Sequence, residues 1–236
     1  MTSQLQHFDT KYRSEEEPWS FSGRAAEVLR HEWLVATARA LAPRRMLDLG
    51  CSLGQLTRRL SVIPTELFGM DISPTAVTRA RARSGPRPQG AGAPVSFSAG
   101  SATALPIANS SFDLVVASDG LYSWEIDVAE RQQALREIHR ILRRGGRALL
   151  TEHTRQERFA VFVDEVRASP LRVESVSYLY DRPWYQFESW LKAVQHWGTA
   201  KALKRNLPLA RALCGIGRML GQRGARHVCV IAVRDA

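Results

Sequence analysis

The chain has 236 residues, of which 44% are hydrophobic and 24% are charged, and its formal net charge at pH 7 is +10. This composition suffices for a sizeable buried core and excludes a disordered chain, and no run approaches the roughly 18–20 apolar residues of a membrane span. The three cysteines lack CxxC spacing and no secretory signal is visible, so we expect a cytoplasmic protein without a disulfide framework or a metal.

In chain order, residues 1–21 are polar and aromatic with an irregular stretch at 15–18, and residues 23–42 have the apolar spacing of a helix. Short apolar strands then alternate with helices. Strands are predicted at 45–49, 66–70, 95–98, 112–118, 147–151, 171–178 and 227–233. Helices are predicted at 53–60, 73–83, 128–143 and 159–167.

The residues before the last strand are predicted to form two further helices, 185–205 and 207–220, with Asn206 as an N-cap. Ordinary loops are rarely this long, so we interpret the segment as a helical lid. The alternation predicts an α/β fold with a doubly wound, Rossmann-like sheet. We divide the chain into an N-terminal cap segment and helix (1–42), a core (43–180), the lid (181–226) and the last core strand (227–236).

A glycine-rich turn, Asp48-x-Gly50-x-Ser52-x-Gly54, follows the first predicted strand and opens a helix. Ligands of open parallel sheets bind beyond the carboxyl ends of the strands, where glycine lets the backbone approach them closely. The dinucleotide pattern G-x-G-x-x-G is absent. Asp48 suits a cationic ligand, and Asp71, at the end of the next strand, is placed to accept both hydroxyls of a ribose. The pattern favours S-adenosylmethionine (SAM) over a dinucleotide.

The turn, the segment 69–74, Leu105-Pro106 with 111–116, and the run 135–146 resemble, in this order, the class I SAM-dependent methyltransferases. The resemblance spans residues 45–151. It implies a seven-stranded sheet of order 3-2-1-4-5-7-6, SAM as donor, S-adenosylhomocysteine as product and no metal. The implied cofactor-binding residues are Asp48, Gly50, Cys51, Ser52, Gly54, Asp71, Ile72, Ser101, Ala102 and Ser118.

Two positions depart from the family pattern. Ser52 replaces the middle glycine of its D-x-G-x-G-x-G motif, and Ser101 replaces the acidic residue that usually contacts the adenine amino group. A serine hydroxyl still accepts a hydrogen bond, so we expect weaker recognition of adenine rather than its loss.

The N-terminal segments 7–14 and 17–21 resemble the opening of the nodulation-type N-methyltransferases, which act on amino sugars of chitin oligosaccharides. This resemblance implies that Trp19 lies against the adenosine and that Arg30 lies near the methionine carboxylate. The stretch 118–122 resembles the acid-x-x-Tyr that follows the fourth strand in that group. Beyond residue 155 there is no convincing match, so the resemblance supports the reaction better than the acceptor.

Methyl transfer to an amine or a hydroxyl requires a proton to leave the acceptor. Asp119, Tyr122 and His153 are candidates for receiving it, because they are predicted at the carboxyl ends of the fourth and fifth strands. The alternatives are that Asp119 orients the acceptor or the cofactor, that Tyr122 lines the pocket, and that His153 is a rim residue bonded to backbone. His227 is interpreted, with the other histidines, as a surface or packing residue.

Aromatic side chains suit flat or sugar-like acceptors, although packing of the lid on the sheet is the simpler explanation for some of them. The candidates for binding the acceptor are Tyr12, Trp124, Trp184, Tyr185 and Trp190. The lid is also strongly basic. This charge either faces solvent or docks an acidic partner, such as a carrier protein, RNA or an anionic membrane surface.

Three hypotheses remain. The first is a bacterial methyltransferase, monomeric or homodimeric, acting on N or O of a small-molecule acceptor such as an amino sugar or a secondary metabolite. The second is an RNA or nucleotide methyltransferase that uses the basic lid; nucleic-acid bases are disfavoured because the N-P-P-Y motif is absent. The third is a SAM-binding protein without turnover.

Overall fold

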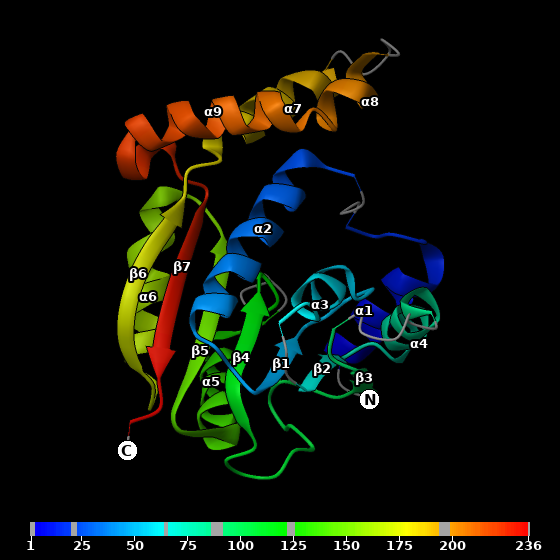
Figure 1. Cartoon of the computed structure of the whole chain (residues 1–236), viewed down its shortest axis with the longest axis vertical. Helices are drawn as coiled ribbons and strands as arrows, with labels where there is room; N and C mark the ends of the chain where they lie inside the picture. Colours follow the sequence, from blue (N-terminus) through cyan, green and yellow to red (C-terminus); the bar gives the residue numbers. More distant parts are fainter. Residues whose placement is uncertain are drawn as a thin grey trace.

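The computed structural model describes residues 3–19, 23–63, 66–85, 92–121, 126–193 and 199–235. At its centre lies one seven-stranded sheet of order β3-β2-β1-β4-β5-β7-β6 (Figure 1), which confirms the predicted Rossmann-like architecture and strand order. Strands β1 to β5 pair in parallel, and β7 runs antiparallel to β5 and β6. The strands are β1 (Arg45–Leu49), β2 (Glu66–Asp71), β3 (Val95–Ala99), β4 (Phe112–Ser118), β5 (Leu142–His153), β6 (Arg172–Leu179) and β7 (His227–Val233).

Both faces of the sheet are covered by helices, which explains why its central strands are almost continuously apolar. Along β4, Val115 and Ala117 enter one core with helices α5 (Val128–Ile141) and α6 (Phe159–Arg167). Leu114 and Val116 enter the opposite core with α2 (Ala25–Ala40) and α3 (Gln55–Leu60). Helix α4 (Pro74–Ser84) packs beside β2 and β3. This doubly wound arrangement leaves the carboxyl edge of the strands open for a site.

Two elements differ from the sequence-based expectation. Helix α1 (Ser3–Ser14) precedes the irregular stretch at 15–18, in residues to which the sequence pattern assigned no helix. In addition, α5 ends at Ile141 and β5 begins at Leu142, five residues earlier than predicted. Leu142 has extended backbone angles and pairs with Phe112, and a register shift follows before the regular pairing of β5 with β4 resumes. Pairing with β4 therefore replaces the last turn of the predicted helix.

The lid segment, defined as residues 181–226, contains α7 (Arg182–Ala193), α8 (Thr199–Lys204), α9 (Leu207–Met219) and the short 3-10 helix η2 (Gly221–Gly224). A second 3-10 helix, η1 (Gln156–Arg158), precedes α6. The side chain of Asn206 caps α9 as predicted, accepting a hydrogen bond from the Leu209 amide. In Figure 1 the lid helices lie across the end of the molecule toward which the β4 arrowhead points, above one end of α2. Within the described residues, no helix combines the length and apolar character needed to cross a bilayer.

Candidate active site at the carboxyl edge of the sheet

The glycine-rich turn after β1 is fixed to β2 by its backbone. The amides of Gly50 and Cys51 both donate to the carbonyl of Met70, at 2.7 and 2.9 Å. Gly50 and Gly54 adopt φ angles of +78° and +74°, a region that disfavours residues with a Cβ. Ser52 has a φ of +51° despite its side chain. The turn therefore presents bare backbone to the space above it and holds one strained non-glycine residue.

Asp71 lies at the carboxyl end of β2, where its buried carboxylate faces the same space. One oxygen accepts the amide of Ser52 and the other accepts the amide of Ser73, each at 2.9 Å. Burial raises the pKa of Asp71, and these two hydrogen bonds oppose the rise. Each carboxylate oxygen can accept a second hydrogen bond, so Asp71 keeps one free acceptor position per oxygen for two neighbouring hydroxyls.

Helix α1 attaches the N-terminal segment to the turn. The Tyr12 hydroxyl donates to Ser52 Oγ at 2.6 Å, and Trp19 Nε1 donates to the Tyr12 oxygen at 2.9 Å. Asp9 accepts from the Ser73 hydroxyl at 2.6 Å at the start of α4. Ser52, the position that departs from the family pattern, is therefore the anchor for the segment. Tyr12, proposed from the sequence as an acceptor residue, lies at the turn instead, and no local sequence signal connects these positions.

A cavity of about 790 Å³ extends from the turn along the carboxyl edge to β5. Among the residues predicted to form the site, those that line it are Tyr12, Trp19, Gly50, Ser52, Asp71, Ile72, Ser101, Ala102, Ser118, Asp119, His153 and Tyr185. We call the part around Asp71 the turn end and the part around His153 the β5 end. Tyr122 and Trp124, which were also predicted for the site, lie outside the described residues.

Several predicted residues lie near the cavity without lining it. Asp48 is fully enclosed beneath the turn and accepts a hydrogen bond from the Thr57 hydroxyl, and burial raises its pKa to about 7. Cys51 packs against Phe97 in a small apolar cluster. A Cβ on Gly54 would meet Phe97 at 3.1 Å. These residues shape the turn from below.

The two lid tryptophans are placed differently from what the acceptor hypothesis expected. Trp184 is fully buried between α2 and α9, in contact with Ala25, Ala26 and Ala210. Trp190 lies on the exposed side of α7 and stacks on Phe187. Of the aromatic residues of α7, Tyr185 does line the cavity. Aromatic spacing alone does not distinguish packing between helices from a cavity wall, which is why the sequence grouped these residues.

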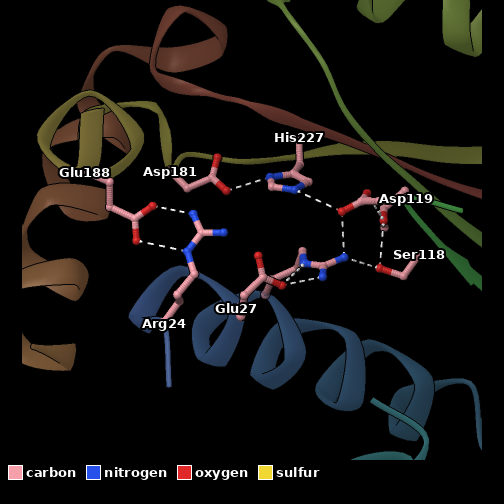
Figure 2. A network of polar contacts seen from close by, with 9 residues as sticks. Arg24, Glu27, Ser118, Asp119, Asp181, Glu188 and His227 are labelled. Carbon is pink, nitrogen blue, oxygen red and sulfur yellow. Dashed lines mark hydrogen bonds and ion pairs between the residues drawn. The ribbon is translucent and has the colours of Figure 1, made fainter. Parts of the chain in front are cut away.

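A buried ionic network crosses the β5 side of the site (Figure 2). Arg30 of α2 bonds Glu27, Ser118 and Asp119. The Asp119 carboxylate also accepts from the Thr151 hydroxyl at 2.8 Å and lies 3.3 Å from His227 Nε2. Burial opposes ionisation, yet Arg30 and His227 hold the pKa of Asp119 far below its usual value. Arg30 therefore lies beside Ser118, with its guanidinium already engaged by protein groups.

His227 connects this network to the lid segment. Its Nδ1 lies 2.6 Å from the Asp181 carboxylate at the start of α7. Burial disfavours a charged imidazole, but Asp181 and Asp119 together raise the pKa of His227 to about 10, so it is an imidazolium at neutral pH. A second buried pair, Arg24 with Glu188, joins α2 to α7. The sequence interpretation of His227 as a surface or packing residue missed this role. The sequence signal for this role was weak, because it consisted of one histidine at the start of an apolar strand.

At the β5 end, Glu152 and His153 close the strand and line the cavity. Burial raises the pKa of Glu152 to about 9, and nearby Asp119 adds to the rise, so this carboxyl is neutral at pH 7. His153 packs on Tyr185 and His227 at ring distances of 4.6 and 4.7 Å. Desolvation at the cavity wall, with the positive His227, lowers the pKa of His153 to about 4. Glu152 was not predicted from the sequence.

The turn end fits SAM. Gly50 and Gly120 leave its floor free of side chains, with their Cα atoms close enough that a Cβ on either would meet the other at 3.6–3.7 Å. Asp71 offers free acceptor positions, and Trp19 and Ile72 provide apolar walls. The cavity is lined by carboxylates and by the cations Lys11, Arg24, Arg131 and Arg158, so both signs of charge are present for the sulfonium, ammonium and carboxylate of SAM.

Comparison with known proteins identifies the domain. Residues 47–150 match the family described as "Methyltransferase domain". The chain is 33% identical over 123 residues to demethylmenaquinone methyltransferase of Clavibacter sepedonicus, covering 51% of this chain and 46% of that protein. The same enzyme of Thermus thermophilus is 33% identical over 113 residues, covering 47% and 48%. The chain thus spans about half the length of the curated relatives it matches.

Solved structures extend the likeness in fold. The N-methyltransferase NodS of Bradyrhizobium japonicum, in complex with S-adenosyl-L-homocysteine, has a TM-score of 0.62 and 20% identity, covering 75% of this chain and 90% of that one. The [4+2]-cyclase SpnF has a TM-score of 0.59 and 25% identity, covering 86% and 80%. The same fold therefore occurs in a protein named for methyl transfer and in one named for a cyclisation.

Proposed function

We propose that this chain is a class I SAM-dependent methyltransferase that transfers a methyl group from SAM to a nitrogen or oxygen of a small-molecule acceptor. The observation that carries the proposal is the single cavity that joins the Asp71 turn to the β5 end. One part of it fits the donor, and the other leaves room for an acceptor beside Glu152 and His153.

When bound, SAM supplies a methyl group that its sulfonium has already activated. The task of the protein is to bring donor and acceptor into line, a contribution worth up to roughly 7–11 kcal/mol as effective molarity. Asp71 would hold the ribose hydroxyls, with Trp19 and Ile72 against the adenosine. Ser101, whose hydroxyl is 2.8 Å from that of Thr103, would lie at the adenine side. Ser118 and the Arg30 network would define the position of the methionine end.

His153 is the group we propose for receiving the proton of the acceptor. Its lowered pKa keeps the imidazole neutral at pH 7, and it lines the cavity at the β5 end. Asp119 is a weak base by contrast, because its carboxylate is stabilised by two cationic partners. We therefore assign Asp119 a positioning role, holding Arg30 and His227. Glu152, neutral at pH 7, would donate a hydrogen bond to a polar group of the acceptor.

The first experiment is titration of the protein with SAM by calorimetry, followed by mass spectrometry of reactions with a panel of acceptors. The panel contains an amino sugar, a hydroxylated aromatic, a naphthoquinol and an RNA. We expect micromolar SAM binding and S-adenosylhomocysteine formation with an amine or hydroxyl acceptor. If the protein does not bind SAM at millimolar concentration, the methyltransferase hypothesis is excluded. Binding without turnover on any acceptor would favour the SAM-binding alternative.

The same panel of acceptors also distinguishes between the alternative acceptor classes. Methylation of the naphthoquinol on carbon would align the chain with the reaction named for its curated relatives. Turnover on RNA that falls steeply with the logarithm of salt concentration would favour the nucleic-acid alternative. In the active reaction, His153→Gln should lower kcat at least tenfold with the SAM dissociation constant unchanged. Full activity of His153→Gln would show that another group receives the proton.

A further inference from the structure

The outer side of helix α9 carries apolar side chains that nothing in the described chain covers. Ile216, Met219 and Leu220 are 50%, 87% and 55% exposed. Their spacing of i, i+3 and i+4 makes them neighbours on one side of the C-terminal end of α9. Single exposed apolar residues are ordinary, but three contiguous ones at a helix end form a patch that requires a reason.

Packing of α9 within the molecule does not supply that reason. Its inner side is already used: Ala210 is buried against α2 and α7, and Leu213 packs in the same cluster. Gly217 approaches the chain so closely that a Cβ would lie 2.1 Å from the Tyr180 carbonyl oxygen. The helix therefore has two apolar sides, and the fold accounts for the inner one alone.

The charged side chains that the lid segment brings to this end of α9 are positive. Arg182 donates to the Arg223 carbonyl at 2.9 Å, and Arg218 lies over the ring of Tyr180, so these three arginines gather at the same end of α9. The acids of the lid segment are just two, Asp181 and Glu188, and both are buried in ion pairs. The solvent side of the lid thus has no carboxylate to balance its cations.

We propose that this lid patch, formed by Ile216, Met219 and Leu220 with Arg182, Arg218 and Arg223, docks the protein on a bilayer surface that contains anionic lipid. Apolar side chains inserted among acyl chains, with cations at the level of the headgroups, are the arrangement of interfacial helices. Phosphate-rich RNA would satisfy the arginines but would leave Met219, the most exposed of the three, in water. Arg211 is not included, because it pairs with Glu32 of α2.

The proposal is independent of the acceptor and of catalysis. Its test is co-sedimentation of the full chain with vesicles of phosphatidylcholine alone and of phosphatidylcholine mixed with phosphatidylglycerol. We expect binding to the anionic vesicles, weak binding to the neutral ones, and a decline as salt screens the surface potential. Met219→Gln combined with Leu220→Gln should lower the affinity for anionic vesicles about tenfold or more. Arg218→Gln combined with Arg223→Gln should do the same and remove most of the salt dependence.

Matched controls lie elsewhere on the surface. Val62 is 56% exposed near α3, and Val62→Gln should leave vesicle binding unchanged. Arg167 of α6 has a side chain 59% exposed, and Arg167→Gln removes one positive charge outside the patch with no expected effect. Because all substituted residues are exposed, thermal melting should verify that each variant is folded.

Three results would overturn the proposal. The first is equal vesicle binding by the patch variants and the controls. The second is absence of vesicle binding together with salt-dependent capture of RNA or of an acidic carrier protein, which would assign the patch to that partner. The third is self-association that Met219→Gln abolishes, which would identify the patch as an interface between copies of the chain.

Discussion

The two ends of the cavity are built in different ways. At the β1–β2 edge, the turn is made from consecutive residues, and its key contacts involve backbone: Gly50 and Cys51 with Met70, and Asp71 with two amides. At the β4–β5–β7 edge, the site consists of side chains from α2, β4, β7 and the lid segment. The first is fixed by local geometry, whereas the second depends on the charges of distant residues balancing one another.

This difference determines which substitutions should disturb the fold and which should disturb ligand binding alone. A backbone-held turn tolerates the loss of one side chain, because the remaining amides keep the chain in place. A buried ionic network does not, because removing one charge leaves its partners desolvated and unpaired.

The largest expected effect follows from Arg30→Met. This change leaves Glu27 and Asp119 without their shared cation in a buried site, and breaking such a pair costs about 3–5 kcal/mol. The free energy of unfolding, measured by urea titration, should fall by that amount. Arg167→Met, which breaks an exposed pair with Asp164, is the matched control and should cost less than about 1 kcal/mol. Equal effects of the two changes would show that the buried network contributes no more to stability than an exposed ion pair.

Asp71→Ala tests the turn end. Loss of the carboxylate removes two charge-assisted hydrogen bonds to the ribose and should weaken SAM binding about 100-fold or more, measured by calorimetry. The turn should stay folded, because the amides of Gly50 and Cys51 still bond to Met70. Asp71→Asn, which keeps one acceptor oxygen, should retain part of the affinity. A collapse in melting temperature larger than that of Arg30→Met would show that the turn also depends on charge.

The pH dependence of the free energy of unfolding tests the ionic network at the β5 end through His227. Neighbouring carboxylates raise the pKa of His227 to about 10 in the folded protein, above the value near 6.5 of an unfolded chain. Its contribution is therefore fully present below pH 6.5 and is lost as the pH rises to about 10. In that window the free energy of unfolding should fall by up to about 1.4 kcal/mol per pH unit more in the wild type than in His227→Gln. Parallel curves for the two proteins would show that His227 is not an imidazolium.

The sequence predicted the sheet, its strand order and most of the turn end, for a physical reason. Alternating strands and helices, and a motif of closely spaced residues such as Asp48, Gly50 and Gly54, are properties of a single stretch of chain. Helix α1 was missed because its apolar residues are few and are satisfied by contacts such as Tyr12 with Ser52, which a local pattern does not contain.

The network at the other end was beyond prediction for the same reason. Arg30 and Asp119 are 89 positions apart, and Asp181 and His227 are 46 apart. Nothing in the periodicity of either segment indicates that these charges meet. The aromatic residues of the lid show a related limit, since Trp184 in the core and Tyr185 at the cavity are adjacent in sequence.

The smallest expected effect concerns Ser52, whose backbone belongs to the turn and whose side chain bonds to Tyr12 of α1. Ser52→Gly relieves a left-handed backbone conformation, worth about 1 kcal/mol, and removes the hydrogen bond from Tyr12, worth a similar amount. Stability and SAM affinity should therefore change by less than about 1 kcal/mol, as measured by melting and calorimetry. Ser52→Ala loses the hydrogen bond but keeps the strain, so it should be the less stable variant. If glycine instead weakens SAM binding tenfold while alanine does not, the backbone strain itself holds the turn in its binding conformation.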